Sequence, residues 1–329
     1  MNMRRLASGA IGLILLLALS VAAATAPQWP EAGRSIQTIV PAQTGSGVGG
    51  IIARLVTDAL AARLGNRIAL HNFTSSNSFP GMLNAIDAST EGYTLLFASV
   101  ETLVIEPALQ RSPSFDPLEN FTPIALVAEI PHILVVNNDL PAHSVGELTD
   151  YIDKYPGVVH FGSSGNGSAL HLAGEFYMSA TGTNMVHVPY SAAEPATNNL
   201  VSGDIQAMFQ VVSGVLNYVR MDKVRALAVM SRDRSPALPD VPTMAEAGHP
   251  GLQATRWYAL LTLRGTPQDI IDHYNTTLNE ALASPELRDR LLELGATPLG
   301  GTPGDLDVFL AREAAKWREI IRDAHLQPR

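Results

Sequence analysis

The chain has 329 residues, of which 46% are hydrophobic, and its formal net charge is −9 at pH 7. This composition suits a globular protein with a sizeable core, and an acidic chain without a basic run is not expected to bind nucleic acid. Its lack of cysteine excludes disulfide bonds, thiol catalysis and thiolate metal sites. An anionic ligand would have to be held by local groups such as backbone amides, because the net charge would not attract it.

The first residues have the pattern of a secretory signal peptide. Arg4 and Arg5 precede an apolar run over residues 6–21, and three alanines at 22–24 offer a site for signal peptidase. We therefore expect residues 1–24 to be removed during export to the periplasm. The run is short for a membrane span, which needs about 20 apolar residues, and an uncleaved anchor is the alternative. A lipid anchor is excluded, because no cysteine follows the run.

The next stretch predicts a strand, a glycine loop and a helix. Residues 35–41 are a short β-branched run, residues 42–50 are rich in glycine, and residues 51–64 have apolar positions at helical spacing, followed by a capping Gly65. Unpaired N–H groups at the start of such a helix form an anion site, and small loop residues let a ligand approach them. The alternative is a tight connection in which glycine serves packing alone.

Two further strands are expected to end in polar loops. The strand over 67–72 is followed by a loop over 73–81 and a helix over 82–88, and the apolar strand over 94–98 ends in the polar stretch 99–102. In an open α/β sheet, ligands bind just outside the carboxyl ends of the strands. The three loops are therefore expected to converge on one place.

A second domain is expected to repeat this arrangement. Two strands, over 120–128 and 133–137, are predicted on either side of Pro131, and we place the crossing into the second domain here. The elements expected next are a helix over 144–155, a strand over 158–161, a glycine loop over 162–168, a helix over 169–180, a strand over 185–190, a helix over 191–201 and strands over 205–210 and 224–230. The strand, glycine loop and helix thus occur a second time.

The remaining chain is expected to return to the first domain. A proline-rich segment over 235–242 leads back, and from about Trp257 the chain rejoins it. Thr266-Pro267 and Ser284-Pro285 each pair an N-cap residue with proline at the first helical position, and the last helix is expected over 305–324. The predicted domains are a discontinuous domain 1 over 28–128 plus 253–329 and a domain 2 over 129–252.

Several motifs together resemble one known family. They are residues 39–41, 91–96, 162–175, 188–190, 225–229 and 234–248. Their order is similar to that of the Bug family, the extracytoplasmic solute receptors of tripartite tricarboxylate transporters, over essentially the whole chain after the signal segment. The resemblance implies an α/β fold of the type II periplasmic binding protein class, with two α/β domains joined by crossing strands and a ligand cleft between them. It also implies that a small carboxylate is held by main-chain amides, small hydroxyls and ordered waters.

Three positions depart from the family pattern. The first loop has Ala-Gln-Thr-Gly-Ser-Gly over 42–47 where the family has a Pro-Pro-Gly-Gly-Gly run, and the second has Thr-Ser-Ser-Asn-Ser over 74–78 in place of Pro-Gly-Ala-Gly-Gly. Gln210 stands where relatives commonly have aspartate. These changes favour a ligand that differs from those of well-known members. The site would offer more side-chain hydrogen bonds and would carry one fewer fixed negative charge. The alternative is a receptor whose binding has degenerated.

The expected ligand-binding residues lie in loops of both domains. From domain 1 we expect Gln43, Thr44, Gly45, Ser46, Gly47, Ser75, Ser76, Asn77 and Ser99. From domain 2 we expect Ser163, Ser164, Asn166, Gly167 and Ser168 as facing donors, and Tyr190, Ser191, Ala192 and Gln210 at the distal end, where specificity is set. Helix capping or turn formation is the alternative role for each serine.

Metal binding is not expected. His171 and Glu175 stand four residues apart on one helix face, but no third ligand has suitable spacing, so a helix-surface pair is the expected arrangement. His132, His143, His160 and His187 are scattered and are predicted to form no cluster.

Two enzyme functions are alternatives to the receptor. Residues 45–50 contain G-x-G-x-x-G between a strand and a helix, as in dinucleotide-binding proteins, but the next strand ends in His71-Asn72-Phe73 without an acid for a ribose. A serine hydrolase is disfavoured because Asn166 occupies the last glycine position of a G-x-S-x-G motif. The alternative to a receptor is thus an exported dinucleotide-binding oxidoreductase.

The sequence therefore predicts a non-enzymatic, exported receptor without a cofactor, which captures a small organic carboxylate between two lobes. Its expected partners are the membrane subunits of a tripartite tricarboxylate transporter, and it is expected to be a monomer. Presentation of the ligand to a sensor and a purely structural role are the remaining alternatives.

Overall fold

The computed structural model describes residues 29–41, 47–73, 79–110 and 116–326. The chain divides into a short N-terminal unit that ends at Ala32 and one compact unit from Gly33 to Arg329, and the fold described below is that of the second unit. The expected signal peptide over 1–24 lies outside the described residues. Within the described ranges, no helix has both the length and the apolar character that crossing a membrane requires.

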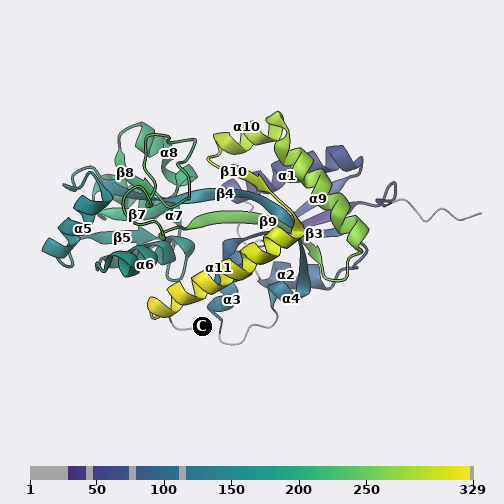
Figure 1. Ribbon diagram of the computed structural model, residues 1–329, viewed down its shortest axis with the longest axis horizontal. Coiled ribbons are helices and arrows are strands. Elements are labelled where there is room, and N and C mark those ends of the chain that lie inside the picture. Colours follow the sequence, from purple (N-terminus) through teal and green to yellow (C-terminus); the bar gives the residue numbers. More distant parts are fainter. Residues whose placement is uncertain (1–28, 42–46, 74–78, 111–115, 327–329) are drawn as a thin grey trace, which may run out of the picture. The chain divides into compact units, whose positions relative to one another are not determined.

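The described strands form one sheet with the order β2-β1-β3-β9-β4-β7-β5-β6, in which β10 and β8 also pair with β4 (Figure 1). The strands are β1 Ile36–Val40, β2 Ile68–Asn72, β3 Thr94–Ser99, β4 Phe121–Asn137, β5 His160–Ser163, β6 Val186–Pro189, β7 Ala207–Val211, β8 Val224–Val229, β9 Thr255–Leu263 and β10 Thr297–Gly300. Two parallel blocks, β2-β1-β3 and β7-β5-β6, flank the antiparallel pair β4 and β9. Parallel strands joined by helices are the α/β arrangement that the sequence predicts.

The long strand β4 differs from the sequence prediction of two strands separated by Pro131. It runs unbroken from Phe121 to Asn137, and Pro131 lies where β4 changes partners. Pro131 is the last residue paired with β9, and His132 is the first paired with β7. Proline has no N–H to donate to the sheet. The next residue, His132, continues the hydrogen bonding, because its N–H donates to the carbonyl of Ala254 at 3.1 Å. A single strand therefore connects both parallel blocks.

The helices largely begin and end where the sequence indicates. They are α1 Val48–Leu64, α2 Phe79–Ile86, the π-helix η1 Glu101–Ile105, α3 Glu106–Ala108, α4 Pro117–Asn120, α5 Val145–Lys154, α6 Ala169–Thr181, α7 Ala193–Ser202, α8 Val212–Arg220, α9 Gln268–Ala283, α10 Pro285–Glu293 and α11 Pro303–Asp323. Ser144 caps α5 by accepting the N–H of Glu147 at 3.1 Å, and Gly65 ends α1 in the left-handed region. Helices η1, α3, α4 and α8 were not predicted from the sequence.

Helix α11 packs against β4, and a buried carboxylate lies at this contact. The indole N–H groups of Trp257 and Trp317 donate to Glu313 Oε2 at 2.9 and 3.1 Å. The Lys316 ammonium lies 2.6 Å from Glu313 Oε1. Both indoles are fully buried, so the carboxylate satisfies two N–H groups that water cannot reach. On the inner side of α11, Leu306, Leu310 and Trp317 are buried, and Phe309 is partly buried.

Candidate ligand-binding site

The ends of the parallel strands position the candidate site. β1 and β3 are parallel neighbours, with Ile39 opposite Leu96, so both end at one edge of the sheet. β5 and β7 are parallel neighbours in the second block. Of the predicted ligand-binding residues after β1 and β2, those that lie outside the described residues are Gln43, Thr44, Gly45, Ser46, Ser75, Ser76 and Asn77.

Gly47 is the one predicted ligand-binding residue of the first loop that the structure describes. It is exposed and forms the N-cap of α1 at a φ of 124°, a conformation that glycine adopts without strain. It has no side chain with which to cap the helix, so the first amides of α1 depend on other partners. This part of the predicted anion site is thus a helix start without a side-chain cap.

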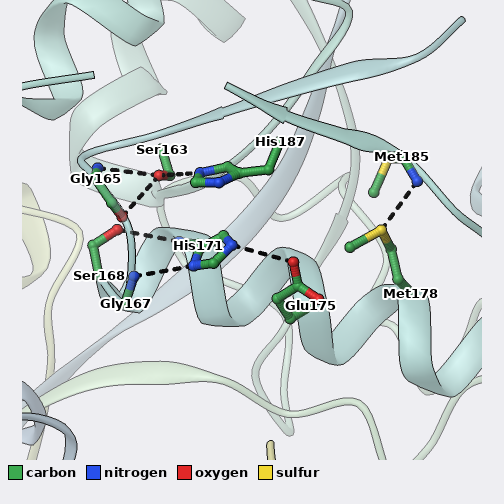
Figure 2. Close-up of polar contacts among 9 residues, drawn as sticks. All are labelled: Ser163, Gly165, Gly167, Ser168, His171, Glu175, Met178, Met185 and His187. Atoms are coloured by element: carbon green, nitrogen blue, oxygen red, sulfur yellow. Dashed lines mark hydrogen bonds and ion pairs between the residues drawn. The ribbon is translucent and has the colours of Figure 1, made fainter. Parts of the chain in front are cut away.

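The loop between β5 and α6 is fixed by hydrogen bonds within the protein (Figure 2). Ser163 is fully buried, and its Oγ lies 2.6 Å from His187 Nε2 and accepts the Gly165 N–H at 3.1 Å. Ser168 caps α6 by accepting the His171 N–H at 3.3 Å. Two of the three hydroxyls predicted in this loop to donate to a ligand, those of Ser163 and Ser168, therefore help to shape the loop.

His171 organises the same loop from within α6. Its Nδ1 accepts the Gly167 N–H at 3.0 Å, so the ring proton lies on Nε2, which is 3.1 Å from Glu175 Oε1 (Figure 2). His171 is only 4% exposed. The helix-surface pair expected from the sequence is therefore a buried pair that orients an imidazole toward the loop.

His187 stacks on His171, a contact that the sequence did not predict. The two ring centroids are 3.8 Å apart and the planes are inclined by 23°. Burial, and next to it the neighbouring His171 ring, lower the pKa of His187 to about 4, so the ring is neutral at pH 7. Among the described residues, no group of three or more His, Asp or Glu side chains is placed to hold a metal ion.

Ser164 and Asn166 present side chains near the surface of this loop, since Ser164 is half-buried and Asn166 is exposed. Gly167 has a φ of 76°, and a Cβ at this position would lie 2.8 Å from Leu109 Cδ1. Only glycine therefore suits position 167. The loop thus approaches the residues that follow α3.

The predicted distal residues are only partly available to a ligand. Gln210 is 3% exposed, donates to Thr197 Oγ1 at 3.2 Å and accepts the Val211 N–H at 2.9 Å, so its amide is used internally. Tyr190 is half-buried, and its hydroxyl accepts a hydrogen bond from Asn199 at 2.8 Å. The two exposed distal residues are Ser191 and Ala192.

Ser99, at the end of β3, borders charged residues that the sequence analysis missed. It is 7% exposed and lies beside Glu101, whose Oε1 accepts a hydrogen bond from Arg256 Nε at 2.8 Å. Burial favours the neutral forms of both groups, but their mutual attraction outweighs it, which lowers the pKa of Glu101 and raises that of Arg256. The polar stretch after the third strand could have indicated Glu101 as a site residue. Nothing in the sequence indicated Arg256, which lies 155 residues away.

A sheet with two parallel blocks, two antiparallel connecting strands and small polar loops at strand ends is the architecture of a periplasmic binding protein. Solved structures agree: Rpa4515 of R. palustris with adipate is 28% identical, with a TM-score of 0.78, and covers 91% of this chain and 100% of its own. MatC from Rhodopseudomonas palustris with bound malate is 27% identical, with a TM-score of 0.73, and covers 88% of this chain and 99% of its own.

The sequence comparisons show the family. The model of the tripartite tricarboxylate transporter family receptor matches residues 52–326. The Bordetella pertussis protein BugT is 33% identical over 98% of each chain. The chain therefore belongs to the tripartite tricarboxylate transporter receptor family, whose members are solute receptors and not enzymes. This confirms the family resemblance and the fold predicted from the sequence, and supports an extracytoplasmic location.

Proposed function

We propose that this protein captures a small organic carboxylate between two lobes and delivers it to a tripartite tricarboxylate-type transporter. The observation that carries the proposal is the loop between β5 and α6, whose shape at the start of a helix is fixed by hydrogen bonds within the protein. The first N–H groups of a helix have no intrahelical partner and attract anions. Two relatives of known structure were solved with adipate and with bound malate, and both ligands are carboxylates.

The proposed lobes are domain 1, over 28–128 plus 253–329, and domain 2, over 129–252. Their boundaries are supported by β4, which changes its partner from β9 to β7 between Pro131 and His132. The return crossing is supported by β9, which begins at Thr255. A receptor of this kind closes when amides from both lobes meet one ligand, because binding then favours the closed form over the open one.

The proposal includes export and a membrane partner. The signal segment over 1–24 would direct the chain to the periplasm, where it would act as a monomer without a cofactor. The membrane subunits of the transporter would then recognise the closed, loaded form. The proposed ligand contacts are the main-chain amides at the starts of α1 and α6, together with the accessible side chains Ser164, Asn166 and Ser191.

A thermal-shift screen of the mature protein tests the proposal. Succinate, adipate, malate, citrate, aromatic acids, amino acids and NAD are added in turn. A ligand at 100 times its dissociation constant adds about 2.7 kcal/mol to the free energy of unfolding, which raises the midpoint by several degrees. We expect at least one acid to do so. The proposal that the protein is a carboxylate receptor would be contradicted if only NAD raised the midpoint, or if no acid did.

A further inference from the structure

Five polar side chains gather just past the end of β3, and we call them the β3-end cluster: Ser99, Glu101, His132, Arg256 and Tyr258. Ser99 and Tyr258 are the last pair in the β3 and β9 ladder. Glu101, two residues after Ser99, forms an ion pair with Arg256, two residues before Tyr258. This pair therefore lies at the edge of the sheet where β1 also ends, the edge at which α/β sheets bind ligands.

Arg256 lies on the face of β9 opposite to α11. Trp257 points to α11, since its indole N–H bonds Glu313 and its ring lies 5.3 Å from that of Phe309. Successive residues of a strand point to opposite faces, so Arg256 and Tyr258 point away from this helix. The ion pair is therefore not part of the packing of α11 against the sheet.

The side chains of Arg256 and Glu101 are the partly exposed members of an otherwise buried cluster. The side chains of Arg256 and Glu101 are 30% and 21% exposed, whereas Tyr258 is 1% and His132 0% exposed. Stability alone does not explain such a pair, because replacing a largely buried ion pair by apolar residues is often neutral or stabilising. A charge that is held in place and still reachable suits recognition of a charged ligand.

The guanidinium of Arg256 has donors left over. Bonds from Nε and Nη2 to Glu101 use two of the five N–H donors of an arginine. A planar guanidinium with one edge fixed by a carboxylate is preorganised to bind a second carboxylate with its remaining edge.

His132 shows that the cluster lacks a polar partner. It lies two residues after Ile130, the residue opposite Arg256, and so on the same face of β4. Its Nδ1 lies 3.2 Å from the carbonyl of Ala254, which places the proton there, and its buried Nε2 has no hydrogen-bond partner. A buried acceptor without a donor is completed by a bound polar molecule.

From this geometry we infer that Arg256, oriented by Glu101, binds a second carboxylate group of the ligand and makes the receptor select dicarboxylates over monocarboxylates. The inference rests on the proposed function and adds the chemical class of the ligand. Ser99 lies beside the same subsite, and a water that accompanies the ligand would supply the missing hydrogen bond to the buried Nε2 of His132.

Calorimetric titration with matched acids tests the inference. Dissociation constants are measured for succinate, adipate and malate and for butyrate, hexanoate and 2-hydroxybutyrate, in which a methyl group replaces one carboxylate. We expect the wild type to bind at least one dicarboxylate about tenfold or more tightly than its matched monocarboxylate, the discrimination typical of a charge-assisted contact. The double variant Glu101→Gln with Arg256→Gln leaves no unpaired charge. In this variant the dissociation constant of the monocarboxylate divided by that of its matched dicarboxylate should fall to about one.

The matched control is Glu246→Gln with Arg234→Gln, which removes the exposed ion pair between Arg234 Nε and Glu246 Oε2. Its ratio should equal that of the wild type. A wild type that binds both acids of each pair equally, or a folded Glu101→Gln with Arg256→Gln variant with an unchanged ratio, overturns the inference but leaves the proposed function. A wild type that binds no carboxylate overturns both.

A measurement on the wild type covers the case in which the double variant does not fold. Arg256 is modified with phenylglyoxal, and its rate of modification is followed by mass spectrometry. The best-binding dicarboxylate should slow this rate severalfold, its matched monocarboxylate should not, and neither should affect Arg234. Equal rates at Arg256 with the two acids overturn the inference.

Discussion

Gly167 shows how one residue sets the shape of the loop before α6. Its N–H donates to His171 Nδ1 at 3.0 Å, and its φ of 76° lies in the region that side chains rarely adopt. Leu109 packs over the position that a Cβ would occupy. Both the main-chain conformation and the lack of a side chain are therefore needed here.

We expect Gly167→Ala to weaken binding of the ligand found in the screen at least about tenfold, because the strained conformation costs roughly 1–2 kcal/mol and the loop must move off Leu109. Affinity is measured by calorimetry. The control is Gly157→Ala, at a φ of 78° with nothing within 4 Å, which carries the same strain outside the loop. Unchanged affinity in Gly167→Ala would place the ligand elsewhere, whereas an equal loss in Gly157→Ala would indicate general destabilisation.

Residue types, but not their partners, could be predicted in this loop. The sequence indicated that Ser163 and Ser168 are polar groups at a strand end and a helix start. It could not show that His187, 24 residues from Ser163, would take up the first hydroxyl. The second serves the capping role that the sequence analysis had kept as the alternative.

At the scale of elements, helix α11 depends on the carboxylate of Glu313. Two buried indole N–H groups and the Lys316 ammonium converge on it. A buried N–H without a hydrogen-bond acceptor costs about 1–3 kcal/mol. By accepting the N–H of Trp257 on β9, Glu313 therefore stabilises the contact between α11 and β9.

We expect Glu313→Ala to lower the free energy of unfolding by about 3 kcal/mol or more, because it leaves both indoles without an acceptor. Glu313→Gln, which keeps one carbonyl oxygen, should lose less. Both are measured by urea denaturation. Glu319→Ala on the exposed side of α11 is the control and should change stability by less than about 0.5 kcal/mol. A loss in Glu313→Ala no larger than in the control would contradict this role.

Element boundaries were predictable where local chemistry decides them. Ser284 and Pro285 start α10 as the sequence indicates, whereas α9 begins at Gln268 with Pro267 as its N-cap, one residue later than expected. The continuation of β4 through Pro131 was not predictable, since it depends on where β9 and β7 meet that strand.

For the whole molecule, buried histidines link stability to pH. Burial is the main cause that lowers the pKa of His132 and of His187 to about 4, below the value of 6.5 for an exposed histidine. Between these values the unfolded chain binds protons that the folded chain does not. The contribution of these two histidines to the free energy of unfolding is therefore fully present above about pH 6.5 and is lost as the pH drops toward 4. Glu129 opposes this trend, because burial raises its pKa.

We expect the free energy of unfolding to be lower at pH 5 than at pH 7, with about 2 kcal/mol of the difference due to His132 and less to the half-buried His187. Urea denaturation at both values measures it. His132→Asn, which keeps a donor for the Ala254 carbonyl, should remove the His132 share of this difference. An unchanged difference in that variant would show that His132 is not responsible.

The sequence by itself determined most of the strands and helices, several of their caps and the repeated strand, glycine loop and helix, because these depend on residues within a few positions of one another. It also determined the family, since the motifs extend along the whole chain. The tertiary structure alone decided that His187 stacks on His171 and that Arg256 meets Glu101. Such contacts depend on which strands become neighbours in the sheet, and no local preference encodes a pairing between residues so far apart.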